Sequence, residues 1–124
     1  MEFALKKNYT YAVVGASNNP DKYGFKILQN LKSKNFSIIP INPKGGEILD
    51  FTVFPKISDV PQKIDVVIFV VPFSLTEKIL PEVRKLEIDK VWMQPGAQSR
   101  KAIQYCLDNN IKCIHDACVM IENL

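Results

Sequence analysis

Four short turns in this sequence combine glycine, proline or small polar residues, and each follows an apolar run. They are Gly15-Ala16-Ser17-Asn18, Asn42-Pro43-Lys44, Val71-Pro72-Phe73 and Gln94-Pro95-Gly96-Ala97. Such residues let a backbone approach a ligand closely or fix a tight turn. Any strand-to-helix connection favours the same residues, so a purely structural role is the alternative for each turn alone. Four such turns in succession favour a binding site for a small molecule.

The first of these turns has the chemistry of an anion site. Gly15 permits a tight turn, and the helix predicted after it presents free N–H groups and the positive end of its dipole. Lys22 lies at the predicted helix start, where a cation is unfavourable unless it meets an anion. We therefore expect Gly15-Ala16-Ser17 and Lys22 to contact a phosphate, with a merely solvated Lys22 as the alternative.

The spacing of this turn differs from the dinucleotide-binding motif GxGxxG. Ser17 and Pro20 stand where that motif has its second and third glycines. The acidic residue that would hold a free ribose after the second strand is missing, and Asn42 and Lys44 occupy that turn. A lysine there suits a phosphorylated ribose, which coenzyme A carries as a 3′-phosphate and NADP as a 2′-phosphate. These residues leave both cofactors open and disfavour NAD.

The elements that must position these turns follow from the alternation of apolar runs and amphipathic stretches. Strands are predicted at 11–14, 36–41, 65–71, 90–93 and 111–114, with a further short one near 52–54. Helices are predicted at 23–34, 74–86 and 99–109, the second with a capping box of Ser74 and Glu77. The run 65–71 shows no alternation, which is typical of a strand covered on both faces.

This order of elements predicts an α/β fold: a three-layer, Rossmann-like, doubly wound parallel sheet of five or six strands. We expect a single domain over residues 1–124, since the length suits one domain and no linker or repeat is visible. In such sheets, ligands bind beyond the carboxyl ends of the strands, at the switch in strand order. All four turns are predicted to lie at that edge.

Composition excludes several classes of function. The net charge is only +3 and the one dense basic cluster is Lys6-Lys7, so we expect no nucleic-acid partner. The longest apolar run, 66–71, is far too short to cross a membrane. Three cysteines without disulfide or zinc spacing indicate a reducing compartment, and we expect a cytoplasmic protein with no metal site.

Six motifs in order resemble the CoA-binding domain family, of the small stand-alone type related to the N-terminal domain of the succinyl-CoA synthetase alpha subunit. The resemblance covers the chain from about Tyr11 to Leu124. The motifs are Val14-Gly15-Ala16-Ser17-x-x-Pro20-x-Lys22, Pro40-Ile41-Asn42-Pro43, Glu47-Ile48, Val70-Val71-Pro72, Val91-Trp92-Met93-Gln94-x-Gly96 and Asp116-x-Cys118-x-x-x-Glu122.

The resemblance implies a role for each matching position in binding coenzyme A. Gly15, Ala16, Ser17 and Lys22 would hold the CoA phosphates; Asn42 and Pro43 would lie by the adenosine, with Lys44 a candidate for the 3′-phosphate; Val71 and Pro72 would flank the adenine or the chain of the cofactor; Gln94 and Gly96 would line the side towards the pantetheine. The sequence departs from the family at Ala117, where relatives often carry a basic residue, so one positive contact is missing.

We expect no catalytic residues. His115 is the only histidine, and no serine or cysteine nucleophile has a visible relay with it, so a structural or solvent-facing role is expected. Cys118 is expected to be a buried thiol, with exchange against CoA disulfides as the alternative. Tyr23 and Trp92 are expected to be packing residues, and Tyr23 is also a candidate for stacking on a ligand.

The expected function is that of a non-catalytic protein that binds coenzyme A or acyl-CoA at the carboxyl ends of the strands. One alternative is an NADP-binding oxidoreductase, although no Tyr-x-x-x-Lys or comparable acid–base pair occurs. The other is an interaction protein whose ancestral cleft is empty. A protein partner or a homo-oligomer is compatible with each of them.

Overall fold

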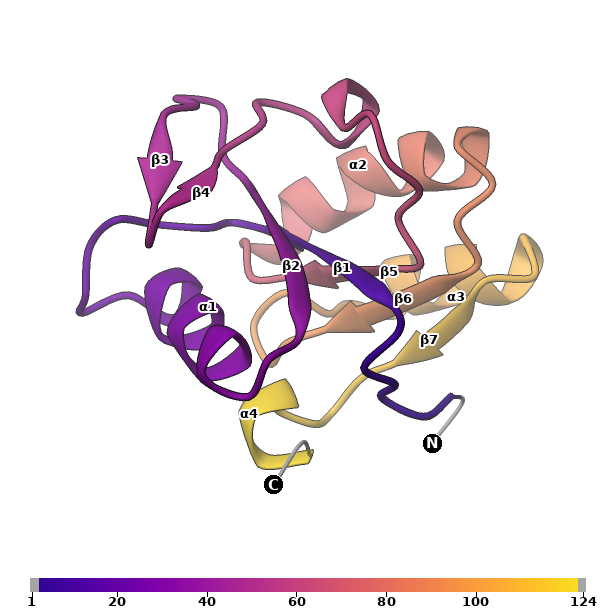
Figure 1. Ribbon diagram of the computed structural model, residues 1–124. Helices are drawn as coiled ribbons and strands as arrows, with labels where there is room; N and C mark the ends of the chain where they lie inside the picture. Colours follow the sequence, from indigo (N-terminus) through magenta and orange to yellow (C-terminus); the bar gives the residue numbers. More distant parts are fainter. Residues whose placement is uncertain (1–2, 123–124) are drawn as a thin grey trace.

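Five parallel strands form the central sheet of the computed structural model, which describes residues 3–122 (Figure 1). They are β1 (Thr10–Val14), β2 (Ser37–Ile41), β5 (Val66–Phe69), β6 (Lys90–Met93) and β7 (Lys112–Ile114). Each lies on one of the five predicted runs. The predicted Rossmann-like α/β class is confirmed, with five strands in the parallel sheet.

The sheet order is β2-β1-β5-β6-β7, and every neighbouring pair is parallel. The chain moves outward from β1 to β2, returns across β1 to β5, and then continues outward in the other direction. The switch in strand order therefore lies between β1 and β5, where Val14 pairs in register with Phe69. In this topology the carboxyl ends of these two strands flank the ligand crevice.

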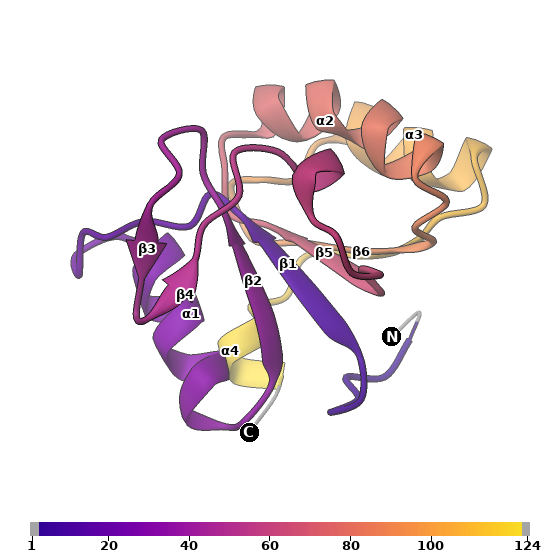
Figure 2. The ribbon, with the colours of Figure 1, turned by 45° about the horizontal axis from the view of Figure 1, so that its top comes forward.

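Helices cover both faces of the sheet (Figure 2). One face carries α1 (Tyr23–Ser33) and the short α4 (Val119–Glu122), and the other carries α2 (Phe73–Lys85), α3 (Arg100–Asp108) and the 3₁₀ helix η1 (Ile57–Asp59). Alternate residues of each strand point to opposite faces, so each strand supplies both apolar layers. This double coverage explains why β5 is apolar at every position.

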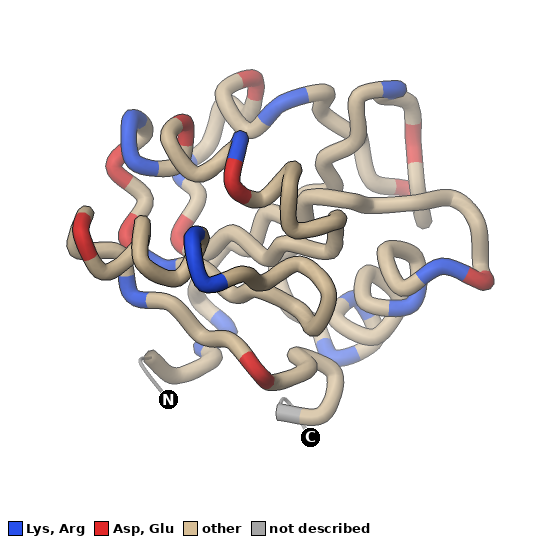
Figure 3. Tube along the Cα trace, turned by 180° about the vertical axis from the view of Figure 1, so that it is seen from behind, with Lys and Arg blue, Asp and Glu red and all other residues tan. Residues whose placement is uncertain are grey.

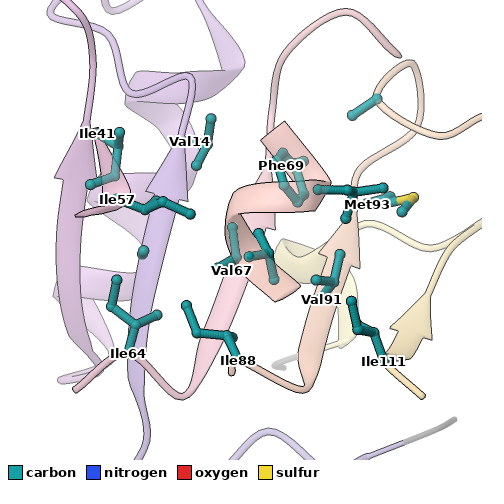
Figure 4. Packing of buried hydrophobic residues seen from close by; sticks show 14 of the residues in the cluster. Val14, Ile41, Ile57, Ile64, Val67, Phe69, Ile88, Val91, Met93 and Ile111 are labelled. Carbon is teal, nitrogen blue, oxygen red and sulfur yellow. The ribbon is translucent and has the colours of Figure 1, made fainter. Parts of the chain in front are cut away.

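The two apolar layers can be separated by the strand residues that they contain. Val14, Val67, Phe69, Val91 and Met93 pack with α2, α3 and η1 (Figure 4). The opposite layer contains, among others, Tyr11, Val13, Ile68 and Trp92 from the strands, Ile27, Leu28 and Leu31 from α1, and Val119 from α4. The sheet edge is thereby held rigidly where the turns emerge.

A small hairpin follows β2. Strands β3 (Glu47–Ile48) and β4 (Phe51–Thr52) pair antiparallel, and Phe54 forms an isolated parallel bridge with Ile41 at the outer edge of β2. The sequence predicted a single short strand near 52–54. The hairpin arises because Leu49 and Asp50 both adopt positive φ, at 51° and 69°, in the tight turn between β3 and β4.

The start of α2 differs from the prediction. The helix begins at Phe73 with Pro72 at the N-cap position, and no side chain caps it. The predicted capping box of Ser74 and Glu77 is therefore wrong. Glu77 instead accepts a hydrogen bond of 2.7 Å from the Ser99 hydroxyl, at the start of α3. Proline fixes φ near its helical value, so Pro72 sets the entry to the helix one residue earlier.

No helix among the described residues is long and apolar enough to cross a membrane. Basic and acidic positions are interspersed along the chain trace (Figure 3).

Candidate ligand-binding site

Three backbone hydrogen bonds join the ends of the four strands from which the predicted turns emerge. The Gly15 N–H donates to the Ile41 carbonyl over 3.2 Å, and the Val70 N–H donates to the Val14 carbonyl over 2.8 Å. The Gln94 N–H donates to the Phe69 carbonyl over 3.1 Å. The turns after β1, β2, β5 and β6 therefore lie side by side, as the parallel topology predicted.

The first turn requires glycine at two positions. Gly15 adopts a φ of +100°, and a Cβ atom there would lie 2.4 Å from the Val70 carbonyl oxygen. Gly24, in the first turn of α1, packs so closely that a Cβ atom would lie 2.0 Å from the Gly15 carbonyl oxygen. Helix α1 therefore starts in direct contact with the turn. A side chain at Gly24 would push the two apart, and one at Gly15 would collide with the backbone that follows β5.

The amino terminus of α1 is left without an internal anion. Lys22 is the N-cap residue, its side chain makes no capping hydrogen bond, and the first turn contains no acidic residue. By contrast, α3 is capped by Ser99, whose hydroxyl accepts a hydrogen bond of 3.0 Å from the Ala102 N–H. A helix start with free N–H groups and a cation beside it is suited to a phosphate.

A polar hollow of about 300 Å³ lies in front of this helix start. Its lining combines small polar side chains with two lysines: Ser17, Asn18, Asn19, Lys22, Asn42, Lys44, Gly45 and Ile48. Among the described residues, the ammonium groups of Lys22 and Lys44 form neither an ion pair nor a hydrogen bond. Both predicted phosphate-binding lysines are thus brought to one hollow with their charges unpaired.

Asn42 holds two of the turns together. Its side-chain amide donates a 2.7 Å hydrogen bond to the Ala16 carbonyl, and its side-chain oxygen accepts one of 2.9 Å from the Lys44 N–H. Its backbone N–H also donates to the Phe54 carbonyl over 3.0 Å. All of these groups are used within the protein, so Asn42 positions Ala16 and Lys44.

An apolar slot of about 240 Å³ opens on the other side of Gly15. Its walls come from the ends of β1 and β2, from η1 and from α2: Val14, Gly15, Ile41, Pro43, Pro55, Lys56, Ile57, Val71, Leu75, Lys78, Ile79 and Glu82. Figure 4 shows Val14, Ile41 and Ile57 close together beside the ends of these strands. The local sequence gives no indication of Lys56, Lys78 and Glu82 as lining residues, because no local pattern shows that α2 and η1 face each other here.

An outer hollow of about 360 Å³ lies beyond β5 and β6 and is lined by Tyr23, Val70, Val71, Pro72, Gln94, Pro95, Gly96 and Cys118. The expectation that Tyr23 is a packing residue is wrong, since 63% of it is exposed. Cys118 is half-buried instead of buried, and its sulfur accepts a 3.2 Å hydrogen bond from the Gln94 amide. Trp92 is buried as expected, with its ring edge against Phe3.

The segment after β7 is fixed to β6 by side-chain hydrogen bonds. The Gln94 side-chain oxygen accepts a 2.8 Å bond from the Val119 N–H, and the Trp92 indole donates one of 2.9 Å to the Ala117 carbonyl. Both polar atoms of the Gln94 side chain are therefore hydrogen-bonded within the protein, the oxygen to the Val119 N–H and the nitrogen to the Cys118 sulfur. Its main role is to hold Cys118 at the wall of the outer hollow.

His115 pairs with its neighbour Asp116. Its Nδ1 lies 2.5 Å from Asp116 Oδ2, and Gln98 donates a 2.6 Å hydrogen bond to the other carboxylate oxygen. The hydrogen bond from Gln98, and after it the contact with His115, lower the pKa of Asp116. The three hollows are lined by other residues, so these side chains flank the site. No group of three or more metal-ligating side chains occurs among residues 3–122.

The structure gathers the predicted site residues around the switch point. Ala16 is buried beneath the first turn. The polar hollow is lined by Ser17, Lys22, Asn42 and Lys44. The slot is lined by Gly15, Pro43 and Val71. The outer hollow is lined by Val71, Pro72, Gln94 and Gly96. Val71 lines both the slot and the outer hollow, so these two spaces adjoin.

Comparison with known proteins identifies relatives of this chain. The chain is 36% identical over 101 residues to an ADP-forming acetate–CoA ligase of Methanocaldococcus jannaschii, a match that covers 82% of this chain and 14% of the ligase. It is 43% identical over 74 residues to ADP-forming acetate–CoA ligase II of Archaeoglobus fulgidus, covering 58% of this chain and 10% of that protein. The chain thus spans about a seventh or less of these relatives.

A solved structure of similar size has the same fold. A conserved hypothetical protein from Pyrococcus furiosus superposes with a TM-score of 0.88 at 34% identity, and the match covers 92% of this chain and 98% of that one. Residues 9–123 match the family described as the CoA binding domain, which includes every turn of the site. Because this match covers most of the chain and the fold agrees with it, this chain belongs to the CoA binding domain family.

Proposed function

We propose that this protein binds coenzyme A, free or acylated, across the carboxyl edge of the sheet and holds it without transforming it. One observation carries the proposal: three adjoining spaces of different chemistry meet around the Gly15 turn. They are a polar hollow with two unpaired lysines, an apolar slot and the outer hollow. Coenzyme A has three parts of matching character: phosphates, an adenine base and a pantetheine chain.

The phosphates fit the polar hollow. Gly15, Ala16 and Ser17 bring the backbone of the first turn to the uncapped start of α1, and Lys22 and Lys44 add two positive charges. Charge-assisted hydrogen bonds to phosphate are about twice as strong as neutral ones. We assign the diphosphate to the side of Lys22 and the 3′-phosphate to the side of Lys44, on the turn that follows β2.

The base and the pantetheine fit the two remaining spaces. The slot between Pro43 and Val71 is mostly apolar and suits the faces of a planar ring. The outer hollow runs past Pro72, Gln94 and Gly96 to the Cys118 thiol. Val71 lines both spaces, and the diphosphate, which joins the adenosine of coenzyme A to its pantetheine, would lie between them beside the Gly15 turn.

The names of the relatives support coenzyme A as the cofactor. The names of the two archaeal ligases state that they join acetate to CoA, and this chain covers 14% and 10% of them. We therefore propose a carrier, a sensor or the cofactor-binding partner of another protein.

A thermal-shift experiment tests the proposal. The melting temperature of the protein would be measured with millimolar CoA, acetyl-CoA, dephospho-CoA, NADP and NAD, for the wild type, Lys22→Ala and Lys44→Ala. A ligand at about 100-fold its Kd stabilises the native state by about 2.7 kcal/mol, which in a domain of this size raises the Tm by several degrees. Lys85→Ala, an exposed lysine at the end of α2, is the matched control.

We expect the Tm to rise with CoA and acetyl-CoA and to rise less with dephospho-CoA. These Tm rises are expected to be smaller in Lys22→Ala and Lys44→Ala, and unchanged in Lys85→Ala. No rise with any ligand would refute CoA binding and favour an interaction protein with an empty cleft. A rise with NADP only would favour the oxidoreductase hypothesis.

A further inference from the structure

We propose that the apolar slot recognises the 6-amino group of adenine through the carboxylate of Glu82. This inference rests on the proposed function and adds the base specificity of the same site. Glu82 lies in the third turn of α2 and lines the slot together with Leu75 and Ile79.

The slot has the size and surface of a subsite for one flat group. Its volume of about 240 Å³ falls below the roughly 300–1,000 Å³ of complete small-molecule sites. Val14 and Ile41 are 4% exposed and Ile57 is 2% exposed, so its inner walls belong to the rigid core. An aromatic base can be covered on both faces by such walls while its edge meets the polar residues of the slot.

Three charged side chains line this otherwise apolar space, and their charges are unpaired. Among the described residues, Glu82 forms no ion pair or hydrogen bond with Lys78 or with Lys56. Lys78 is four positions before Glu82 on the same helix, a spacing at which opposite charges often pair. A half-buried carboxylate that is left unpaired beside an apolar surface retains its full capacity to accept hydrogen bonds.

The sign of the Glu82 charge selects the part of the ligand that it faces. A carboxylate repels phosphates, so it is unfavourable in a site for an anionic cofactor unless it meets a donor. The exocyclic amine of adenine is such a donor, and the neighbouring ring nitrogens are acceptors. Lys56 and Lys78 can donate to those nitrogens. An adenine in the slot would therefore give the Glu82 carboxylate a donor and the ammonium groups of Lys56 and Lys78 acceptors.

The test compares the Kd of CoA with that of its 6-oxo analogue, in which hypoxanthine replaces adenine, by isothermal titration calorimetry. Both ligands carry the same charge, so long-range electrostatic effects cancel in the ratio of the two Kd values. We expect wild-type protein to bind CoA about tenfold or more tightly than the analogue, the effect of one hydrogen bond to a charged group. In Glu82→Gln the ratio is expected to fall to about one, since an amide can turn either its oxygen or its nitrogen to the base.

Glu87→Gln is the matched control, because it makes the same change at an exposed residue beyond the end of α2, and its ratio is expected to equal that of the wild type. If wild-type protein binds both ligands equally, or if Glu82→Gln keeps the wild-type ratio, the base specificity is refuted while CoA binding stands. If wild-type protein binds neither ligand, both the specificity and the proposed function are refuted. Circular dichroism of each variant establishes that it is folded.

Discussion

The two edges of the sheet use polar residues in opposite ways. At the amino edge, where the strands begin, charged and polar side chains are paired with one another or with the backbone. At the carboxyl edge, where the strands end, several charges around the three hollows are unpaired and two helices start without a side-chain cap.

The amino edge shows how this chain builds structure from polar groups. The Tyr11 hydroxyl donates to the Lys6 carbonyl and accepts from the Lys6 N–H, both at 2.9 Å. The Asp65 carboxylate accepts a 2.8 Å bond from the Thr10 N–H. Lys90 lies 3.0 Å from Asp89, and this hydrogen bond raises the pKa of Lys90 and lowers that of Asp89. Asp65 and Asp89 directly precede β5 and β6 and therefore lie at the edge opposite the candidate site.

Around the polar hollow and the apolar slot, the carboxyl edge lacks this pairing although the same residue types are present. Lys22, Lys44, Lys56, Lys78 and Glu82 gather around two hollows without pairing within the described part of the chain. Because lysine and acidic residues form pairs at the amino edge, the same residue types could also have been paired at the carboxyl edge. The unpaired set therefore indicates a ligand with charges of its own, and four predictions test this contrast.

The largest effect is expected from Gly24→Ala, which forces a side chain into the contact between α1 and the first turn. Overpacking at the Gly15 carbonyl is expected to lower the free energy of unfolding by roughly 2 kcal/mol, although alanine favours helix by about 1 kcal/mol. The CoA-dependent Tm rise is expected to disappear. Urea unfolding and thermal shift measure the two quantities.

Gln29→Ala, at an exposed position of the same helix, is the control and should change stability by less than about 0.5 kcal/mol. A Gly24→Ala protein that is as stable as the wild type and still responds to CoA would show that the close contact is unnecessary.

The second prediction separates the two edges directly. Lys22→Ala is expected to weaken CoA binding about tenfold while changing stability by less than about 0.5 kcal/mol. Lys90→Ala is expected to do the reverse, because Lys90 pairs with Asp89 and lies 5.2 Å from the centre of the Tyr9 ring. Its loss should cost about 1 kcal/mol of stability. Calorimetric titration and urea unfolding of both variants would show whether the roles are distinct; equal effects of the two variants on affinity would contradict the contrast.

The third prediction concerns the buried hydroxyl of the amino edge. Burial raises the pKa of Tyr11 to about 12, against about 10 for an ordinary tyrosine. The stability that this group contributes is fully present below pH 10 and is lost as the pH rises towards 12. Tyr11→Phe should cost about 1 kcal/mol at pH 7 through the lost hydrogen bonds, and the difference from wild type should shrink above pH 10. Urea unfolding at pH 7, 9 and 11 tests this, and a constant difference would exclude a raised pKa.

The smallest effect is expected at Asp116, an acid of the carboxyl edge that is paired. Its pKa is lowered, so its contribution to stability is present above the ordinary carboxyl pKa of about 4 and is lost as the pH falls below it. Asp116→Asn keeps the φ of +60°, which asparagine tolerates, and should lie closest to wild type in Tm at the lowest pH. Thermal unfolding between pH 6 and pH 3 measures this, and a Tm gap that is independent of pH would contradict it.

Much of the fold could be predicted because the apolar runs are short and well separated. The strand over 90–93 agrees with β6 at both ends, and the helix over 23–34 exceeds α1 by one residue. The positions of Gly15, Lys22 and Lys44 in the site followed from the rule that parallel strands present their carboxyl ends at one edge. Only the local sequence and this rule were needed.

The features that could not be predicted from the sequence depend on contacts between segments that are far apart along the chain. Glu82 and Lys56 line one slot only because η1 packs beside α2 in the folded chain. The hydrophobic periodicity of the sequence does not indicate this packing. The partner of Glu77 is Ser99, 22 residues further along the chain. Helix α4 is not among the predicted helices, and its place follows from the hydrogen bond between Val119 and Gln94. Such contacts require the three-dimensional arrangement.

The two outer strands of the sheet have a consequence for aggregation. An exposed strand edge offers its backbone groups to other molecules. Here the edge of β2 is partly occupied by Phe54, whose N–H donates to the Pro40 carbonyl over 3.1 Å. The opposite outer strand, β7, has only three residues and begins with an exposed lysine, Lys112. A neighbouring molecule therefore finds little backbone to pair with at either edge, which protects the protein from growing into intermolecular sheets.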